Sequence, residues 1–307
     1  MTVSKSPHYT FEDLGDGITA AIARPDGFAV CNSAIVAQPE GGLVFDTGLT
    51  PDSAQDLRAN VERILGRPPS VGVNSHRHLD HALGNSEFPK IPIWGTRRTR
   101  EVILETHDQT MAELTREALE RDIRELESRR PQMRTEATRA DLEFILHMNR
   151  ALLASAGKAR LLPPTETFDT QVRLPGSRAI DLRSFGSGHT EADAIMLLPS
   201  ERVVAAGDLV VLSLQPSMGN GDPRHWLVVL DELQKLNPER IIPGHGPVSG
   251  PEGIEETRAY VAGVLEAAAA SPQAPLPAAL RRWEGTLSLE ENLRFTREWL
   301  ATHEPHR

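Results

Sequence analysis

The sequence predicts an α/β fold of four layers, in which two stacked β-sheets lie between outer layers of helices. Two observations lead to this prediction. The chain runs twice through the same order, from β-type segments to an amphipathic helix and then to a short buried strand, and a long helical segment separates the two halves. Because a sheet must bury its apolar face against another layer, two such halves are expected to stack sheet against sheet.

The first half contains one clear amphipathic helix among short β-type segments. Residues 51–65 carry apolar side chains at positions i, i+4, i+7 and i+8, and Pro51 stands at the start, where a helix tolerates proline. Turns rich in Gly, Pro and Asp separate the apolar runs around this helix. We expect strands in this half at 18–23, 29–37, 43–45, 71–73 and 91–95.

The second half repeats this order with a helix at 226–236. We expect its strands at 168–174, 179–185, 194–198, 203–206 and 240–243. The two halves together define a core at about 10–250. Inside this core, the Glu- and Arg-rich segment 98–157 is a helical insertion that Pro131 divides into at least two helices. Residues 251–307 form a helical C-terminal extension.

Charge and hydropathy limit the partners of this protein. Acidic residues outnumber basic ones by 43 to 33, which gives a formal net charge of −10 and argues against nucleic acid as a partner. No segment approaches the roughly 18 consecutive apolar residues of a membrane span, and the N-terminal stretch MTVSKSPHYTFEDLGDG lacks the apolar part of a signal peptide. We therefore expect a cytoplasmic protein without a membrane partner.

Histidines crowd the stretch NSHRHLDHALGN, directly after the expected strand 71–73. Alternate positions in extended backbone send His76 and His78 to the same side of the chain. Asp80 and His81, in the turn that follows, can present a second cluster of ligands close by. A solvated loop that happens to hold several histidines is the alternative interpretation. The pattern favours a metal site.

Three more fragments place metal-seeking side chains where expected strands end: His189 in GSGHTEAD, Asp208 in AAGDLVV and His245 in IIPGHGPV. Each alone also fits a Gly-rich turn. Together with the first cluster they supply five histidines and two aspartates, enough for two zinc ions that each keep a place for solvent. Cys31, the only cysteine, is expected to be a buried strand thiol, so a metal site must use His, Asp and Glu.

The chain resembles the hydrolases of the metallo-β-lactamase fold. It carries the ordered signatures of that superfamily, with a ligand set similar to that of its glyoxalase II and lactonase branches: VFDTG (44–48), SHRHLDH (75–81), GHT (188–190), GDLV (207–210) and PGHG (243–246). The fold implied is the αβ/βα sandwich predicted above, here with a helical insertion.

The resemblance implies a site with two zinc ions, although iron or manganese in the same ligands remains open. Around the first ion it implies His76, His78 and His189. Around the second it implies Asp80, His81 and His245, and it implies that Asp208 bridges the two ions. Asp46, from the first signature, is implied to orient ligands or loops from outside the metal shell. A simple turn formed by Asp-Thr-Gly is the alternative for Asp46.

The reaction expected from such a site is hydrolysis. Water on one zinc has a pKa of ~7, and a second cation lowers it further, so a metal-bridging hydroxide exists at neutral pH. Asp80 and Asp208 are the expected catalytic carboxylates, since Asp80 would aim the hydroxide and Asp208 would hold both ions. We expect an acyl bond of a small molecule to be cleaved, in an ester, thioester, lactone or lactam.

Three alternative functions remain open from the sequence. β-Lactam cleavage, as a main or a side activity, is the first, although the lactamases of the superfamily generally lack the bridging aspartate. A phosphodiesterase would use the same paired ions, but the sequence shows no basic patch and no inserted nuclease domain. An iron-dependent oxidoreductase would use the same ligands, as in the persulfide dioxygenases of the superfamily.

Two segments are expected to surround the site. The insertion 98–157 emerges near the strand ends that carry the ligands and is expected to cover the pocket. A homodimer contact or an outer packing layer is the alternative for this insertion. The stretch LSLQPSMGNGDPRHW after Asp208 is a second candidate wall, in which four side chains are candidates for substrate contact: Met218, Asn220, His225 and Trp226.

Overall fold

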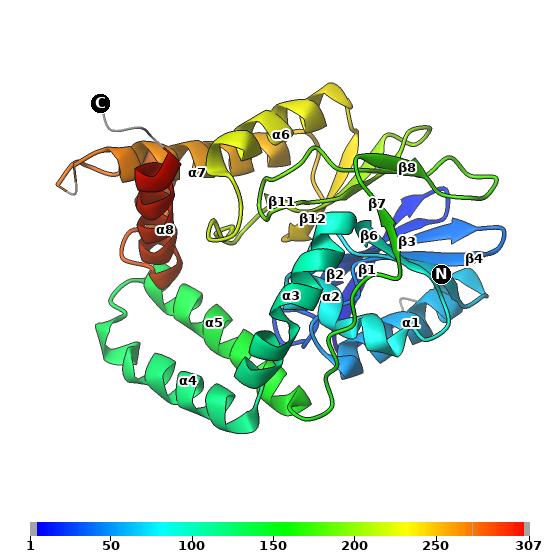
Figure 1. Cartoon of the computed structure of the whole chain (residues 1–307), viewed down its shortest axis with the longest axis horizontal. Helices are drawn as coiled ribbons and strands as arrows, with labels where there is room; N and C mark the ends of the chain where they lie inside the picture. Colours follow the sequence, from blue (N-terminus) through cyan, green and yellow to red (C-terminus); the bar gives the residue numbers. More distant parts are fainter. Residues whose placement is uncertain (1–4, 272, 304–307) are drawn as a thin grey trace.

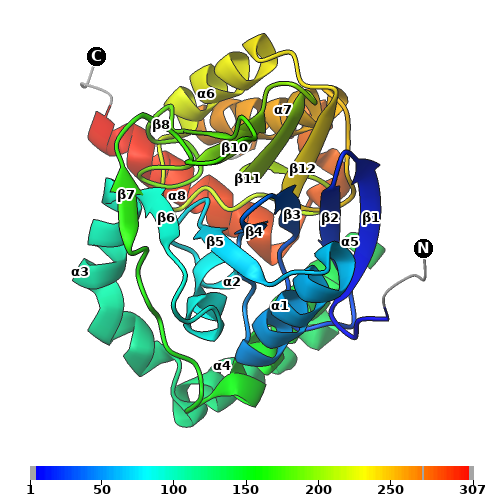
Figure 2. The same cartoon turned by 90° about the vertical axis from the view of Figure 1, so that its right-hand side faces the viewer.

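A computed structural model describes residues 5–271 and 273–303 of the chain. Two β-sheets pack face to face, and helices cover both outer faces (Figures 1 and 2). The predicted four-layer α/β fold is therefore confirmed. Residues 272 and 304–307 of the expected C-terminal extension lie outside the described part.

The first sheet has seven strands, which lie in space in the order of the sequence. They are β1 (Tyr9–Gly15), β2 (Ile18–Ala23), β3 (Ser33–Gln38), β4 (Gly41–Phe45), β5 (Pro69–Val73), β6 (Ile93–Thr96) and β7 (Glu166–Phe168). Strands β1 to β4 pair antiparallel, whereas β4 to β7 pair in parallel. The carboxyl ends of β4 and β5 therefore lie side by side, directly before Asp46 and the histidine-rich stretch.

The second sheet has five strands in the order β12-β11-β10-β9-β8. They are β8 (Gln171–Arg173), β9 (Asp181–Arg183), β10 (Ile195–Leu198), β11 (Val203–Val211) and β12 (Arg240–His245). Neighbours are antiparallel except for β11 and β12. Because this last pair is parallel, the carboxyl halves of both strands reach the same edge of the sheet, the usual place for a ligand site in an α/β fold.

Helices form the outer layers and the additions to the core. They are α1 (Pro51–Leu65), α2 (Leu79–Ala82), α3 (Arg97–Glu113), α4 (Arg116–Ser128), α5 (Glu136–Ser155), α6 (Pro223–Lys235), α7 (Glu252–Ala269) and α8 (Leu287–His303), with short 3₁₀ turns at Leu83–Glu87, Arg130–Gln132 and Ala278–Trp283. Among the described residues, none of the helices combines the length and the apolar character needed to cross a bilayer.

Helix α1 forms where the sequence predicts it because both of its ends are capped. Thr50 accepts a hydrogen bond from the backbone N–H of Ser53, and the side chain of Ser53 accepts one in return from the backbone N–H of Thr50. This reciprocal cap satisfies N–H groups that lack partners within the helix. At the other end Gly66 takes a left-handed conformation with φ 69°, which favours glycine.

The core between the sheets is formed by inward-facing apolar side chains. The first sheet contributes residues such as Val36 and Phe45, and the second contributes residues such as Leu182, Met196 and Ile242. A second cluster joins the first sheet to α1, and a third joins the second sheet to α6 and α7. Because the central strands of both sheets are buried on both faces, the core fixes the position of the strand ends that carry the polar signatures.

The insertion consists of three helices, α3, α4 and α5. A threonine precedes and caps each of them, and Pro131 lies in the 3₁₀ turn that separates α4 from α5, as the sequence predicts. An additional break at Leu114 separates α3 from α4. Asp141 of α5 accepts hydrogen bonds from the backbone and the hydroxyl of Ser288 on α8, so the insertion is tied to the C-terminal extension.

Several strand boundaries differ from the sequence prediction. Strand β3 begins only at Ser33, because Val30 has φ 68° and cannot continue an extended strand. The expected strand 168–174 is two strands, β7 and β8, which belong to different sheets because the chain crosses between them. Strand β11 runs on to Val211, so that Asp208 lies within it rather than at its end. The edge strand β1 was not predicted because its outer face is exposed and polar.

Candidate metal centre

Seven side chains from both sheets converge at one edge of the sandwich. Strand β5 leads into the loop and short helix α2 that carry the histidine-rich stretch, while the loop after β9 and strands β11 and β12 supply the remainder. The seven form two groups, within each of which the ligand-capable atoms lie within 4.8 Å of one another. The first group is His76, His78, His189 and Asp208, and the second is Asp80, His81 and His245. The structure thus brings together all residues that the resemblance implied as ligands.

The first group is tightly packed, with His76, His189 and Asp208 buried and His78 partly exposed. Nε2 of His189 lies 3.0 Å from Nδ1 of His78 and 3.3 Å from Oδ2 of Asp208. Nε2 of His76 lies 4.0 Å from the same carboxylate oxygen. The ring of His189 stands nearly perpendicular to those of His76 and His78, with both centroid distances 4.8 Å.

The second group faces the other oxygen of the same aspartate. Oδ1 of Asp208 lies 3.2 Å from Nε2 of His81 and 3.4 Å from Nε2 of His245. Oδ2 of Asp80 lies 3.4 Å and 3.3 Å from the same two nitrogens. Asp208 therefore presents one oxygen to each group, which is the arrangement of a bridging ligand.

These separations fit metal ions better than direct hydrogen bonds. A tetrahedral zinc site with ligand distances of about 2.0–2.1 Å places neighbouring ligand atoms about 3.3 Å apart. Nε2 of His76, Nε2 of His81 and Oδ1 of Asp208 are buried and have no hydrogen-bond partner. Because buried polar atoms without partners are costly, two cations would complete this site.

Asp46 determines which nitrogen of His81 carries a proton. Its Oδ2 lies 2.8 Å from Nδ1 of His81, and its two oxygens accept hydrogen bonds from the backbone and the hydroxyl of Ser75 at 2.7 Å and 2.8 Å. A proton on Nδ1 leaves the lone pair of Nε2 for the second group. The structure places Asp46 outside the ligand groups and in contact with one of them.

Asn220 has the same relation to His78, with the opposite nitrogen. Its Oδ1 lies 2.8 Å from Nε2 of His78, so that a proton held there leaves Nδ1 for the first group. The sequence prediction gave Asn220 a role in substrate contact. In the structure it is not among the residues that line the cavity and instead orients a ligand.

The two groups differ in electrostatics. Burial lowers the pKa of His76 well below its usual value and that of His189 to about 3. Burial acts in the same direction on His245, but the carboxylates of Asp208 and Asp80 outweigh it and raise the pKa of His245 to about 10. Acidic groups around His81 likewise raise its pKa against the effect of burial. Without metal at neutral pH, these shifts favour neutral histidines in the first group and protonated histidines in the second, while Asp208 between them is ionised.

Two glycines allow the close approach that aims Asp208. A side-chain carbon at Gly244 would collide with Oδ1 of Asp208, and one at Gly207 would lie 2.5 Å from the side chain of Ser75. Gly207 also has φ 53°, and the register of β11 against β12 shifts there. A local irregularity of this kind redirects the next side chain. The glycines of the GDLV and PGHG signatures therefore both help to position the carboxylate of Asp208.

A cavity of about 400 Å³ opens over the ligands. His78, Asp80, Asp208 and His245 belong to its lining. The other lining residues are Leu49, Leu79, Phe144, Ile145, Met148, Leu152, Val211, Leu214, Gln215, Pro216, Ser217, Ser288, Glu291 and Asn292. Helix α5 of the insertion thus covers the metal groups, and the ring of Phe144 packs edge-on against His245 with centroids 6.3 Å apart.

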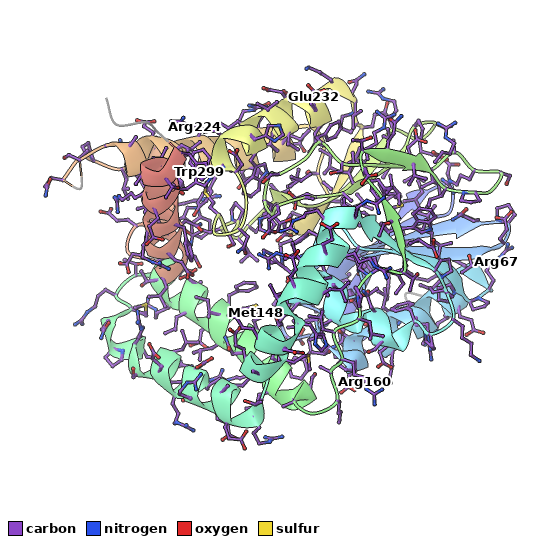
Figure 3. The ribbon with its side chains drawn as sticks, in the orientation of Figure 1. Arg67, Met148, Arg160, Arg224, Glu232 and Trp299 are labelled. Atoms are coloured by element: carbon purple, nitrogen blue, oxygen red, sulfur yellow. The ribbon has the colours of Figure 1, made fainter. Side chains whose placement is uncertain are left out.

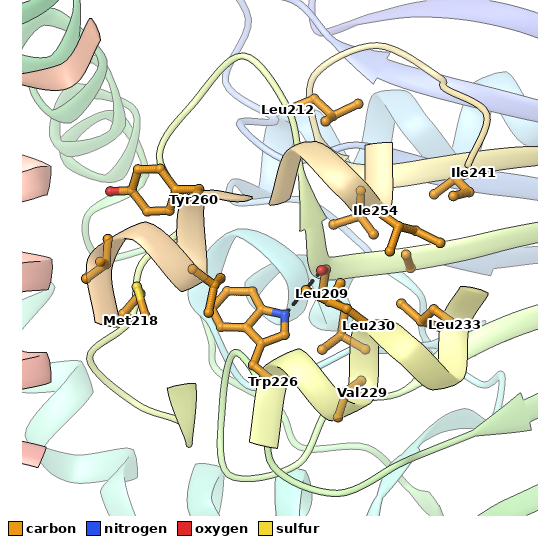
Figure 4. Packing of buried hydrophobic residues seen from close by; sticks show 14 of the residues in the cluster. Leu209, Leu212, Met218, Trp226, Val229, Leu230, Leu233, Ile241, Ile254 and Tyr260 are labelled. Carbon is orange, nitrogen blue, oxygen red and sulfur yellow. Dashed lines mark hydrogen bonds between the residues drawn. The ribbon is translucent and has the colours of Figure 1, made fainter. Parts of the chain in front are cut away.

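The other three predicted substrate contacts lie away from this cavity. Trp226 and Met218 are buried in the hydrophobic cluster behind the second sheet, where Nε1 of Trp226 donates to the carbonyl of Leu209 (Figure 4). Nδ1 of His225 lies 2.6 Å from the carbonyl of Ser187 and holds the loop that leads to His189. The amphipathic α6 turns its apolar face to β11, which explains why Trp226 packs rather than lines the pocket. Met218 lies in the segment before α6, where its backbone N–H donates to Asn292.

Sequence reasoning missed Ser75 and the cavity face of α5. Ser75 is the second residue after β5, and its hydroxyl contacts Asp46 and Nδ1 of His76. Its position within the SHRHLDH signature was the available signal. For α5, the signal was that Phe144 and Met148 add apolar side chains on a further face of the helix, and the structure leaves both of them only partly buried.

Comparisons with known proteins agree with this geometry. The family model of the metallo-beta-lactamase superfamily matches residues 26–245, which include all seven ligand positions. A linear primary-alkylsulfatase from Pseudomonas sp. (strain ATCC 19151) is 25% identical over 233 residues, 72% of this chain and 43% of the relative. A metallo-beta-lactamase type 2 from Bacteroides fragilis is 30% identical over 86 residues, 26% of this chain and 34% of the relative.

The chain spans less than half of the length of these curated relatives. Among solved structures, the DIM-1 metallo-beta-lactamase superposes with a TM-score of 0.59 at 15% identity, over 83% of this chain and 98% of the other. A metallo-beta-lactamase from Pontibacter korlensis gives a TM-score of 0.57 at 18% identity, over 83% and 99%. These two likenesses establish the fold. On the match of the family model over most of its length, the chain belongs to the metallo-beta-lactamase superfamily.

Proposed function

We propose that this protein is a dinuclear zinc-dependent hydrolase that cleaves an acyl bond in a small molecule, an ester, thioester or lactone. The observation that carries this proposal is the position of Asp208, whose two oxygens face two separate ligand groups beside one cavity. When bound, two cations at these groups supply Lewis acidity for a carbonyl oxygen and activate water as a nucleophile at neutral pH. Both curated relatives are hydrolases by name, which supports this class.

The residues of the chain itself orient the reactants in this proposal. Asp80 lines the cavity and would accept a hydrogen bond from the attacking water and pass its proton to the leaving group. Asp46 and Asn220 keep the protons of His81 and His78 on the nitrogens that point away from the ligand groups. Helix α5 covers the cavity and limits the access of bulk water.

The charge of the cavity favours acyl over phosphodiester substrates. Among the described residues that line it, there is no lysine or arginine, and three are acidic: Asp80, Asp208 and Glu291. Phosphate recognition in proteins depends on cationic side chains or on backbone N–H groups at a helix start. A phosphodiester would find only the cations as partners here.

A second candidate function is the cleavage of an alkyl sulfate ester. The relative with this activity in its name aligns over 72% of the chain. In this chain, the sulfate group would find only the cations as partners, as a phosphodiester would, and the activated water would be the nucleophile. An apolar alkyl chain would also suit the leucine-, phenylalanine- and methionine-rich wall of the cavity.

Metal analysis and a substrate panel test the proposal. We expect about two zinc ions per chain in purified protein, and hydrolysis of thioesters, lactones or simple esters in preference to a chromogenic cephalosporin, bis-4-nitrophenyl phosphate and sodium octyl sulfate. Octyl sulfate as the best substrate would establish the second candidate. One iron per chain together with oxygen consumption would replace hydrolysis by oxidation, and β-lactam or phosphodiester cleavage as the main activity would also refute the proposal.

Three further predictions from the sequence belong to this proposal. The protein is expected in the cytoplasm, without nucleic-acid or membrane partners, and as a homodimer through the helical insertion. Light scattering at several concentrations tests the dimer. Leu104 is an apolar residue on α3 that is 56% exposed. If a Leu104→Ala variant is still a dimer, the dimer contact lies elsewhere.

A further inference from the structure

One wall of the cavity is a continuous apolar surface supplied by a single helix. Phe144, Met148 and Leu152 follow one another at intervals of four residues on α5, so they lie along the same face of the helix. Figure 3 shows Met148 on the inner side of α5, facing the interior of the molecule. Phe144, at one end of this row, contacts the ring of His245. We call these three side chains the α5 wall, and it begins at the metal groups.

The side-chain amides in the lining already form hydrogen bonds within the protein. Oδ1 of Asn292 accepts a hydrogen bond from the backbone of Met218, and Nδ2 donates to the carbonyl of Pro216 and to the hydroxyl of Tyr260, all at 2.9 Å. This amide therefore has no free donor for a ligand. Its role is to hold the segment between β11 and α6 in place.

Gln215 and Ser288 are occupied in the same way. The amide nitrogen of Gln215 donates to Thr286 at 3.0 Å, and its oxygen accepts from Tyr260 at 3.1 Å. The hydroxyl of Ser288 donates to Asp141 at 2.5 Å. These two side chains and that of Asn292 thus bond to other residues of the protein. Apart from the ligands, Ser217 is the one further uncharged polar side chain among the described lining residues. A substrate group with hydrogen-bonding needs would find few partners away from the metal groups.

The charge of the lining excludes an anionic tail. Apart from the ligands, the one charged side chain among the described lining residues is Glu291, and no lysine or arginine balances it. A carboxylate or phosphate on the distal part of a substrate would meet a negative charge and an apolar wall. An uncharged, apolar tail meets neither penalty.

We infer that the substrate is an uncharged acyl compound whose acyl chain is apolar and lies along the α5 wall. This inference rests on the proposed function and adds the substrate class to it. Each methylene buried against the wall adds about 0.8 kcal/mol, a factor of about fourfold in affinity. The cavity of about 400 Å³ sets an upper limit to the chain that fits.

A binding experiment tests the inference independently of turnover. Alkanohydroxamic acids place a metal-binding group next to an acyl chain, so calorimetry on the zinc-loaded protein can compare acetohydroxamic, butanohydroxamic and hexanohydroxamic acid with succinic monohydroxamate. We expect Kd to fall about fourfold for each added methylene, and the charged succinyl compound to bind less tightly than the butanoyl compound. A Kd that does not change with chain length, or tighter binding of the succinyl compound, would overturn the inference.

Variants of Met148 assign the effect to the α5 wall. Met148→Lys should abolish the gain per methylene and improve binding of the succinyl compound, whereas Val228→Lys, the same kind of change at an exposed position on α6 outside the cavity, should behave as the parent. Met148→Trp keeps the wall apolar and should stop the gain in affinity at a shorter chain, which provides a second test if the lysine variant does not fold. Unchanged chain-length dependence in a folded Met148 variant would refute the assignment.

Turnover of 4-nitrophenyl esters with the same acyl chains separates the inference from the proposed function. Hydroxamates that bind with the expected dependence while no ester, thioester or lactone is cleaved would refute the proposed reaction and leave the apolar acyl site standing. Ester cleavage that is independent of chain length, with equally flat hydroxamate binding, would support the reaction and refute the α5 wall as a substrate site.

Discussion

The two ligand groups of this protein share one aspartate and lie side by side, yet the pKa values of their histidines are shifted in opposite directions. In the first, burial keeps His76 and His189 neutral, with lone pairs already available. In the second, the nearby carboxylates hold protons on His81 and His245. The first group therefore takes a cation without losing protons, whereas the second must exchange protons for its cation.

This difference shows how the number of nearby carboxylates sets the protonation state of the histidines in a ligand group. The first group has three imidazoles for one carboxylate oxygen, so neutral nitrogens dominate. In the second, Asp80 and Asp208 face two imidazoles, and Asp46 adds a third carboxylate behind His81. The comparison predicts that the first group binds its cation before the second at mildly acidic pH.

Replacement of the shared ligand has the largest expected effect. Asp208→Ala removes one oxygen from each group and should reduce turnover by roughly two to four orders of magnitude, with weaker binding of both ions. Metal content per chain and kcat/KM on the best substrate measure this. Asp181→Ala, in the neighbouring part of the same sheet, is the control that should keep both ions. Normal turnover in a folded Asp208 variant would contradict the bridging role of Asp208.

A change behind His81 should separate the two groups. Asp46→Asn removes the charge that holds the proton on Nδ1, and loss of such a partner typically costs about 10–100-fold in metal affinity. We expect this loss for the second ion alone. Zinc titration by calorimetry resolves the two steps, and equal weakening of both would contradict the assignment of Asp46 to one group.

The matching change behind His78 should have a smaller effect. Asn220→Ala removes the partner of Nε2, but this contact lies at the exposed side of the site, where water can replace the lost amide. We expect weakening of the first ion by about tenfold, at the low end of such effects. Asn220→Asp, which still accepts the hydrogen bond, should restore it. Failure of that rescue would mean that Asn220 acts by packing.

Proton release gives the finest test of the comparison. At pH 7 the first zinc should displace almost no protons, and the second should displace about one or more, since the pKa of His189 is about 3 and that of His245 about 10. Calorimetry in buffers of different ionisation enthalpy counts these protons. Equal release in the two steps would erase the distinction between the groups.

The same pKa shifts predict how the metal-free protein responds to pH. The pKa of His245 is raised on folding, so its contribution to stability is complete below about pH 6.5 and is lost as pH rises through about 10. The pKa of His189 is lowered, so its contribution is complete above about pH 6.5 and is lost as pH falls through about 3. Thermal unfolding with a chelator should therefore give the highest Tm near neutral pH, and a Tm that rises steadily toward pH 9 would argue against the raised pKa.

The sequence predicted much of the sandwich because helix caps, turns and apolar stripes depend on residues that are close together in the chain. Helix α1 has its predicted bounds, since caps and an apolar stripe are encoded within a few residues. The prediction failed where distant contacts decide. Val30 leaves the extended conformation, and the backbone of Asn32 bonds to Gly244, more than 200 residues away. The 168–174 run splits because its two halves pair with different sheets.

The same division holds for the site. Spacing and residue type identified the seven ligand positions, because extended backbone and strand ends constrain where such side chains point. Helix periodicity, by contrast, did not distinguish an apolar residue that packs from one that lines a cavity. Trp226 and Met218 therefore entered the prediction as pocket residues, and Phe144 and Met148 did not.

By itself, the sequence determined the layered α/β fold and the set of groups that can hold metal, since these follow from local order and from the chemistry of single residues, and its ordered signatures indicated the family by resemblance. The bridging position of Asp208 and the cover by the insertion were expected, but only the tertiary structure decided that Asn220 contacts His78 and that Phe144 and Met148 of α5 line the cavity. Each of these depends on contacts between segments far apart in the chain, whose relative positions are fixed by the packing of the whole core.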